Sequence, residues 1–248
     1  MVYHLYITNK NYSSWSLRPW LLMKVLNIPF LEHLEYLTPG SYSQPQWKAF
    51  SPTAHVPCLH DISSSSDSDS EEKIILWESL SIVEHLSDMH PTSGIYPPIN
   101  KAAAARAWAR SSVAEMHASF NALRNEMGMN IGLRLQLLSP SESLVADLER
   151  INALWSEGLS RFGGPYLAGK NFCAVDAFFA PVVLRLQTYV NSIEYITDEK
   201  VKEYVQRILS LPELKEWVDE ALKETIREPV HDEESLEGKK LLEDLRAV

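Results

Sequence analysis

Cysteine is scarce in this sequence, since only Cys58 and Cys173 occur among 248 residues. Two distant thiols exclude a disulfide framework, and neither lies in a Cys-x-x-Cys pair of the kind that binds zinc. The sequence also lacks an apolar run of about 18 residues, the length of a membrane span, and the basic start and cleavage site of a signal peptide. We therefore expect a cytoplasmic protein that binds no metal and contacts no membrane.

Positive charge is the minority charge, with 23 lysines and arginines against 33 acidic residues and a net charge of -10. The basic residues do not cluster with aromatic residues in the pattern that tracks a phosphate backbone. A nucleic acid partner is therefore not expected. The hydrophobic content of 45% is ordinary for a globular protein and suffices for a large core.

The first ninety residues change periodicity quickly, as is typical of a small α/β domain. A strand, a helix and a second strand follow one another, which predicts a parallel pair joined by a right-handed crossover. The predicted strands are residues 2–7, 30–37, 56–60 and 74–77, and the predicted helices are residues 15–26 and 78–89, with a short helix or turn at residues 44–50.

A polar insert at residues 63–72, rich in serine and acidic residues, separates the last two predicted strands. Such a composition cannot form a core, so a mobile hairpin loop is expected. Serines among acidic residues also suit phosphorylation, but a tolerated loop insertion is the simpler interpretation.

Prolines and glycines at residues 90–100 indicate a domain boundary. Residues 1–90 would form one domain and residues 101–248 a second, all-helical domain. Its predicted helices are residues 101–129, 141–162, 174–190, 198–209 and 213–225, and the last twenty residues are expected to form a charged surface appendage.

A serine-rich turn joins the first predicted strand to the first helix, with Ser13, Ser14 and Ser16 around Trp15. Helix N-termini expose backbone N–H groups and the positive end of the helix dipole, so this turn is a natural anion site. On position alone, the preferred interpretation is that Ser13 or Ser14 simply caps the helix. Three serines in four residues also suggest a binding function.

Two further motifs occupy similar positions. Val56-Pro57 places a proline directly before a strand, and Glu78-Ser79 lies where a strand passes into a helix. Alone, the first is a common dipeptide in the trans form, and the second is an acidic first turn with a cap. Together with the serine turn they supply the groups that a thioredoxin-like domain uses to bind a short peptide.

With these motifs in order, the sequence resembles the soluble glutathione transferases over almost its whole length. Residues 13–18 resemble the S-S-x-S-x-R signature of the zeta class and of related bacterial and fungal enzymes, residues 55–57 the cis-proline loop, and residues 78–79 the Gln/Glu-Ser pair. Residues 169–177 resemble the buried capping box before the core helix of the second domain. The resemblance implies an α/β N-terminal thioredoxin-like domain plus an all-α C-terminal helical bundle.

Two positions depart from the pattern. Trp15 stands where zeta-class enzymes have cysteine, which makes maleylacetoacetate isomerisation, the zeta activity, a less secure expectation. Cys173 stands at the capping position where serine or threonine is usual, and a thiol is a weaker hydrogen-bonding group.

The resemblance implies that glutathione is a co-substrate and that a serine hydroxyl holds its sulfur as a thiolate. Ser13 matches the first signature serine, and Ser14 is its close competitor. A hydrogen bond and the helix dipole both lower a thiol pKa. We expect Ser13 to contact the sulfur and Ser14 to cap the helix.

The remaining parts of glutathione are assigned by the same resemblance. Val56, ahead of a cis Pro57, would pair through its backbone with the cysteinyl part, and Glu78 and Ser79 would take the γ-glutamyl group. His55 would reach the glycyl carboxylate, or be a solvated loop histidine.

For the second substrate, the family builds a pocket between the serine turn and the first helix of the bundle. Candidate residues are Trp15, Met116, His117, Phe120 and Arg124. The same spacing describes an ordinary core stripe, which is the preferred interpretation for most of them. His117 and Arg124 are the more informative polar neighbours.

The resemblance further implies detoxification of a small electrophile by a homodimer. One alternative is a binding or regulatory protein that keeps the fold without catalysis. Another is an omega-type thiol transferase, but neither Cys58 nor Cys173 lies at the serine turn.

Overall fold

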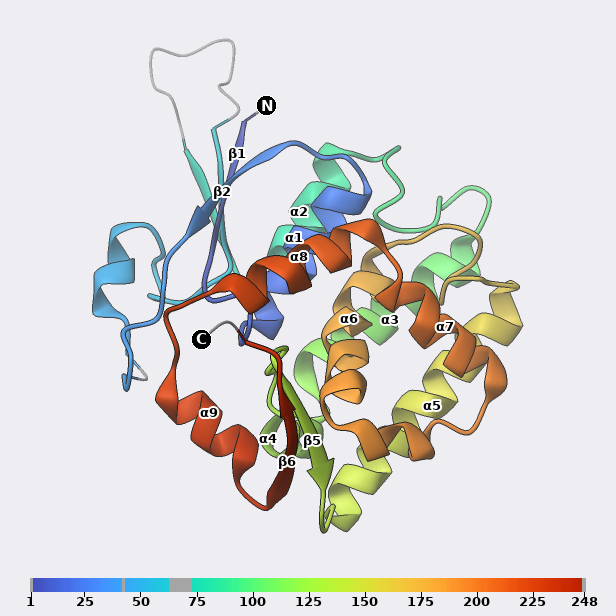
Figure 1. Ribbon diagram of the computed structural model, residues 1–248. Coiled ribbons are helices and arrows are strands. Elements are labelled where there is room, and N and C mark those ends of the chain that lie inside the picture. Colours follow the sequence, from blue (N-terminus) through green and yellow to red (C-terminus); the bar gives the residue numbers. More distant parts are fainter. Residues whose placement is uncertain (1, 42, 63–72, 247–248) are drawn as a thin grey trace.

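The computed structural model describes residues 2–41, 43–62 and 73–246 (Figure 1). The insert at residues 63–72, expected to be a mobile hairpin loop, lies outside the described residues. None of the described helices is both long enough and apolar enough to cross a membrane.

The N-terminal region is a mixed four-stranded sheet in the order β2-β1-β3-β4. β1 pairs in parallel with β2, as the strand-helix-strand pattern predicted, and antiparallel with β3, which pairs antiparallel with β4. The elements are β1 (Tyr3–Ile7), α1 (Ser14–Val25), β2 (Phe30–Leu34), the 3-10 helix η1 (Pro45–Ala49), β3 (Cys58–Asp61), β4 (Ile74–Trp77) and α2 (Ser79–Met89).

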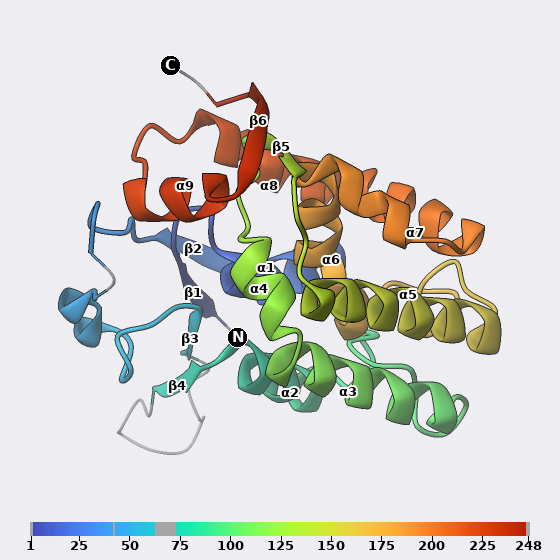
Figure 2. The ribbon, with the colours of Figure 1, turned by 90° about the horizontal axis from the view of Figure 1, so that it is seen from below.

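The C-terminal region is mostly helical, and α1 lies between the sheet and α6 (Figure 2). Its elements are α3 (Ala103–Ala118), α4 (Asn121–Glu126), β5 (Leu133–Leu137), α5 (Glu142–Phe162), α6 (Ala174–Thr188), the 3-10 helix η2 (Val190–Tyr195), α7 (Glu199–Leu209), α8 (Pro212–Lys223), α9 (Pro229–Leu236) and β6 (Lys239–Asp244).

The predicted continuous helix at residues 101–129 is wrong. α3 ends at Ala118, Ser119 is extended, and Phe120 adopts a left-handed backbone with φ +62° before α4 begins. That conformation costs a non-glycine residue about 1–2 kcal/mol. Burial of the Phe120 ring, which packs edge-on against Phe179, offsets this cost.

The expectation of an all-helical second domain is also corrected, because β5 and β6 form a two-stranded antiparallel sheet. Leu133, Leu135 and Leu137 are buried and alternate with half-buried polar residues, which is the period of a strand. The last twenty residues are therefore not an appendage. They contain all of α9 and all of β6, and β6 lies between α9 and β5 (Figure 1).

Helix α6 is the centre of the helical region, and every one of its residues except Gln187 is buried. The predicted capping box is present at its start, with Cys173 at the N-cap. The Asp176 carboxylate accepts hydrogen bonds from the backbone N–H groups of Cys173 (2.9 Å) and Leu167 (3.0 Å). Burial raises the pKa of Asp176 to about 6.

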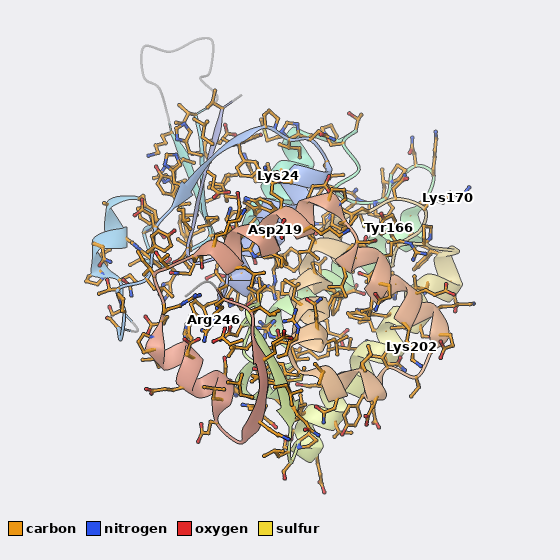
Figure 3. The ribbon with its side chains drawn as sticks, viewed as in Figure 1. Lys24, Tyr166, Lys170, Lys202, Asp219 and Arg246 are labelled. Carbon is orange, nitrogen blue, oxygen red and sulfur yellow. The ribbon has the colours of Figure 1, made fainter. Side chains whose placement is uncertain are left out.

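Replacing Asp176 tests the importance of this buried cap. Asp176→Ala leaves two buried N–H groups without acceptors, and we expect a loss of about 3 kcal/mol in the free energy of unfolding, measured by urea denaturation. Asp219→Ala is the matched control, because Asp219 is exposed on α8 (Figure 3) and should change stability by less than about 0.5 kcal/mol. Equal losses in the two variants would contradict the role given to the cap.

Candidate functional site

The register of the sheet brings the three N-terminal motifs together. Cys58 at the start of β3 is paired with Tyr6 near the end of β1 and with Trp77 at the end of β4. The chain therefore leaves β1, enters β3 and leaves β4 at one edge of the sheet. The serine turn follows β1, Pro57 precedes β3, and Glu78 follows β4, so they lie along that edge.

In the serine turn, Ser13 is the N-cap of α1, and its oxygen accepts the N–H of Ser16 at 3.3 Å. The Ser13 hydroxyl also donates to the Ser16 hydroxyl at 2.7 Å. The expectation that Ser14 would cap the helix is thus corrected. Capping depends on which residue has the non-helical backbone, and Ser13 has it, with ψ 87°, whereas Ser14 is already helical.

Ser14 instead points to the helical region. It is 6% exposed, and its hydroxyl oxygen accepts a hydrogen bond at 3.3 Å from the Nη2 of Arg185 on α6. The sequence analysis did not select Arg185. A single arginine within a strongly apolar helical segment was the signal that would have identified it.

The cis-proline loop has the predicted geometry, since the Val56-Pro57 peptide bond is cis. Among the described residues, neither the backbone N–H nor the C=O of Val56 has a hydrogen-bond partner. His55 is exposed, and its Nδ1 lies 2.7 Å from the carbonyl oxygen of Thr53. The loop thus presents free backbone groups beside the serine turn.

Glu78 and Ser79 begin α2 as predicted. Glu78 is exposed at the N-cap with φ +71°, and its side chain does not cap the helix. Non-glycine residues with positive φ are uncommon and concentrate at functional sites. The first N–H groups of α2 are therefore open to a ligand. Ser79 is buried, and Nη1 of Arg18 lies 3.5 Å from its hydroxyl oxygen.

Trp15 has a cationic and aromatic environment. The guanidinium carbons of Arg18 and Arg124 lie 4.1 and 4.7 Å from its ring centroid. The His117 ring packs edge-on at 5.2 Å. Burial, and then the charges of Arg18 and Arg124, lower the pKa of His117, which keeps this imidazole neutral at pH 7.

Arg18 is fully buried, and burial together with the charges of Arg124 and Arg185 lowers its pKa well below the usual value. Its guanidinium also stacks on Phe178 at 4.8 Å. Nε and Nη2 have no hydrogen-bond partner within the part of the chain that the structure describes. The site thus contains an arginine cluster, Arg18, Arg124 and Arg185, in which Arg18 and Arg185 have donors without partners among the described residues.

A cavity of about 640 Å³ opens beside the serine turn. Tyr12, Ser14, Trp15, Arg124 and His231 are among the residues that line it. Two of the five residues predicted for the second-substrate pocket, Trp15 and Arg124, are therefore at its wall. Met116 and Phe120 belong to the hydrophobic core instead, as the core interpretation favoured, and His117 packs on Trp15.

The C-terminal segment contributes groups that the sequence analysis missed. Glu224 is buried and accepts the N–H groups of Lys10 (2.6 Å) and Asn11 (3.3 Å), which lie just before the serine turn. Burial raises the pKa of the Glu224 carboxyl. Trp217 donates its indole N–H to the carbonyl oxygen of Lys10 at 3.0 Å. No local pattern in the sequence marks such contacts.

Asp232 of α9 connects the C-terminal segment to the serine turn and to the helical region. Its carboxylate accepts hydrogen bonds from the Tyr12 hydroxyl (3.1 Å) and the Asn130 amide (2.9 Å). Arg246, labelled in Figure 3, adds an ion pair with Asp232 at 2.6 Å. Asn130 in turn accepts from the Asn11 amide at 2.9 Å. The described residues contain no group of three or more side chains suited to hold a metal ion.

Comparisons with known proteins agree on one family. Residues 12–89 match the family model described as the glutathione S-transferase N-terminal domain, and this range contains all three motifs. The glutathione S-transferase-like protein OpS6 of Beauveria bassiana (strain ARSEF 2860) is 24% identical over 202 residues, which cover 78% of this chain and 84% of OpS6.

Solved structures show the fold. Glutathione transferase Omega 2S from Trametes versicolor in complex with 2,4-dihydroxybenzophenone has a TM-score of 0.62 at 18% identity, covering 89% of this chain and 96% of that one. Glutathione transferase F2 from Populus trichocarpa scores 0.63 at 19% identity, covering 88% and 98%. A glutathione transferase homolog from Burkholderia gl BGR1, with bound glutathione, scores 0.56 at 21% identity, covering 89% and 98%. They confirm the expected fold class, with a thioredoxin-like N-terminal sheet and a C-terminal region that is mostly helical.

The capping role of Ser13 predicts a stability effect. Ser13→Ala removes the acceptor for the Ser16 N–H, and we expect the free energy of unfolding to fall by about 1 kcal/mol. The control is Ser139→Ala, at an exposed position before α5, which should have little effect. Thermal and urea unfolding of both variants measure the difference. An unchanged midpoint for Ser13→Ala would contradict the capping role.

Proposed function

We propose that this chain is a cytoplasmic glutathione transferase of the serine type, which activates glutathione for attack on a small electrophile. The observation that carries the proposal is the alignment of the serine turn, the Val56-Pro57 loop and the start of α2 along one edge of the sheet. The family match over residues 12–89 and the glutathione bound in a relative of the same fold support it.

Glutathione would lie across this edge as a short extended peptide. The free N–H and C=O of Val56 would pair with its cysteinyl part as in an added strand. The γ-glutamyl carboxylate would meet Ser79 and the open N–H groups of α2, where the helix dipole favours an anion. Glu78 would take the γ-glutamyl amine, and the exposed His55 the glycyl carboxylate.

The chemistry would take place at the start of α1. A hydroxyl of Ser13 or Ser14 would donate a hydrogen bond to the glutathione sulfur, and the helix dipole would act in the same direction. Both effects lower the thiol pKa from its free value of about 8.5, so that a thiolate exists at neutral pH. The thiolate then attacks the electrophile.

The second substrate would occupy the cavity beside Trp15 and Arg124, formed largely by residues 101–248. Residues 1–90 would thus bind glutathione, and the helical region would select the electrophile. Conjugation with loss of a leaving group, as in detoxification, and glutathione-dependent isomerisation of the maleylacetoacetate type both use this arrangement.

Binding and turnover test the proposal separately. We expect glutathione to bind in calorimetry and to react with a chlorodinitrobenzene. Glu78→Gln and Ser79→Ala should each raise KM for glutathione about tenfold, because each removes a hydrogen bond to a charged group of the peptide. Glu149→Gln, at an exposed position on α5, is the control.

Two outcomes would count against the enzyme. Binding of glutathione without turnover of either an aromatic halide or maleylacetoacetate would favour the non-catalytic regulatory alternative. Absence of glutathione binding would contradict the proposed site itself.

The functional unit that we propose is a homodimer, because the family pairs the N-terminal domain of one subunit with the helical domain of the other. Closed two-fold symmetry is also the commonest assembly of soluble proteins. Sedimentation at micromolar concentration should give a mass of about twice 28.2 kDa. A mass that stays at that of one chain over a tenfold concentration range would contradict the dimer.

A further inference from the structure

Arg185 is a buried cation in contact with the serine turn. It lies in α6 and is 4% exposed. Its Nε donates to the carbonyl oxygen of Met127 at 2.6 Å, and its Nη2 donates to the Ser14 hydroxyl at 3.3 Å. Its third donor group, Nη1, has no partner among the residues that the structure describes. The guanidinium is thus hydrogen-bonded to Ser14 from the side of α6.

The charge of Arg185 is not balanced locally. Within the described part of the chain, no carboxylate forms an ion pair with it or with its neighbours Arg18 and Arg124. Burial and the charge of Arg124 lower the pKa of Arg185 to about 10, so it remains protonated at neutral pH.

The other titratable groups that face the arginine cluster are Tyr189, His117, Glu78 and Asp147. Burial raises the pKa of Tyr189 and lowers that of His117, which leaves both neutral at pH 7. Glu78 and Asp147 act on Arg18 and Arg124 at longer range, without forming an ion pair. A buried cation without a partner is costly, and an anion bound at Ser14 would relieve that cost.

We propose that Arg185 is a positioning residue for the glutathione thiolate, which orients the Ser14 hydroxyl toward the sulfur and stabilises the negative charge. The inference rests on the proposed function and deepens it. A guanidinium only donates hydrogen bonds, so it occupies a lone pair of the Ser14 oxygen and leaves the hydroxyl proton to be donated elsewhere. Ser14 lines the cavity, so this proton is available to the sulfur of a glutathione bound there. The proton of the thiol leaves to water.

The same contacts disfavour Ser13 as the sulfur ligand. Its hydroxyl proton is donated to Ser16, and its oxygen accepts the Ser16 N–H. Contact with the sulfur would require Ser13 to give up the first of these bonds. Ser14 has no competing acceptor among the described residues. The geometry therefore assigns the sulfur to Ser14, the reverse of the expectation from the sequence.

The expected effect is large enough to measure. A sulfur bound by the Ser14 hydroxyl would lie about 6 Å from the guanidinium. In a partly buried site, the attraction between the guanidinium and a thiolate at that distance lowers the thiol pKa by about one. Arg185→Met removes the charge while keeping most of the side-chain volume. Titration of the bound thiol by its ultraviolet absorbance, with the pH profile of kcat/KM, reports the change.

Arg185→Met should raise the apparent thiol pKa by about one and lower kcat/KM about tenfold at pH 6.5, with convergence toward the unaltered protein at high pH. Arg185→Lys, which keeps the charge, should recover part of the shift. Arg207→Met is the control, because Arg207 donates to the carbonyl oxygen of Pro165 away from the site. An unmoved titration in folded Arg185→Met would overturn the inference.

A second pair of variants covers the case in which Arg185→Met does not fold. Ser14→Ala should raise the thiol pKa more than Ser13→Ala does, and the reverse order would overturn the assignment. If the unaltered protein binds glutathione without forming any thiolate, both this inference and the proposed function are contradicted. A normal titration in the unaltered protein that depends on neither Ser14 nor Arg185 contradicts the inference alone.

Discussion

The burial of α6 is the constraint on which the rest of the structure depends. A helix surrounded by protein on all sides can carry a charged group only where its neighbours supply hydrogen bonds. Asp176 meets this condition at the start of the helix through two backbone N–H groups. Arg185 meets it near the other end through Met127 and Ser14. Stability at one end of this helix and the chemistry that we propose at the other thus depend on the same packing.

Because α1 packs against α6, the serine turn is held from two directions. The sheet fixes where the turn begins, through the register of β1 with β3. Helix α6 places Arg185 against Ser14 of the turn. The thiolate that we propose would therefore belong to neither region alone, since its hydrogen-bond donor comes from α1 and its nearest cation from α6. This differs from the view suggested by the sequence, in which the N-terminal domain alone activates glutathione.

The local part of the fold was predictable from sequence. The strands and helices of residues 2–89 follow from periodicity, and Pro57, Glu78 and Ser79 lie where motif order placed them. The failures share a physical cause. β5 is a short alternating segment whose partner is about a hundred residues away, and Phe120 interrupts a helical pattern with a left-handed backbone whose cost is offset by tertiary packing of its ring. Likewise, Ser13 and Ser14 differ only by backbone angles that composition does not encode, and Arg185 acquires meaning only beside Ser14.

The contacts of Glu224 have a consequence for the order in which the protein is built. This carboxylate bonds the N–H of Asn11 across 213 residues of sequence. During synthesis the sheet and the serine turn leave the ribosome early, with the Lys10 and Asn11 N–H groups still facing water. Closing so long a loop lowers the conformational entropy of the chain. Packing of α8 and of the segment after it must offset this loss. We therefore expect the turn at Lys10 and Asn11, which is translated early, to reach its final form only after Glu224 has been made.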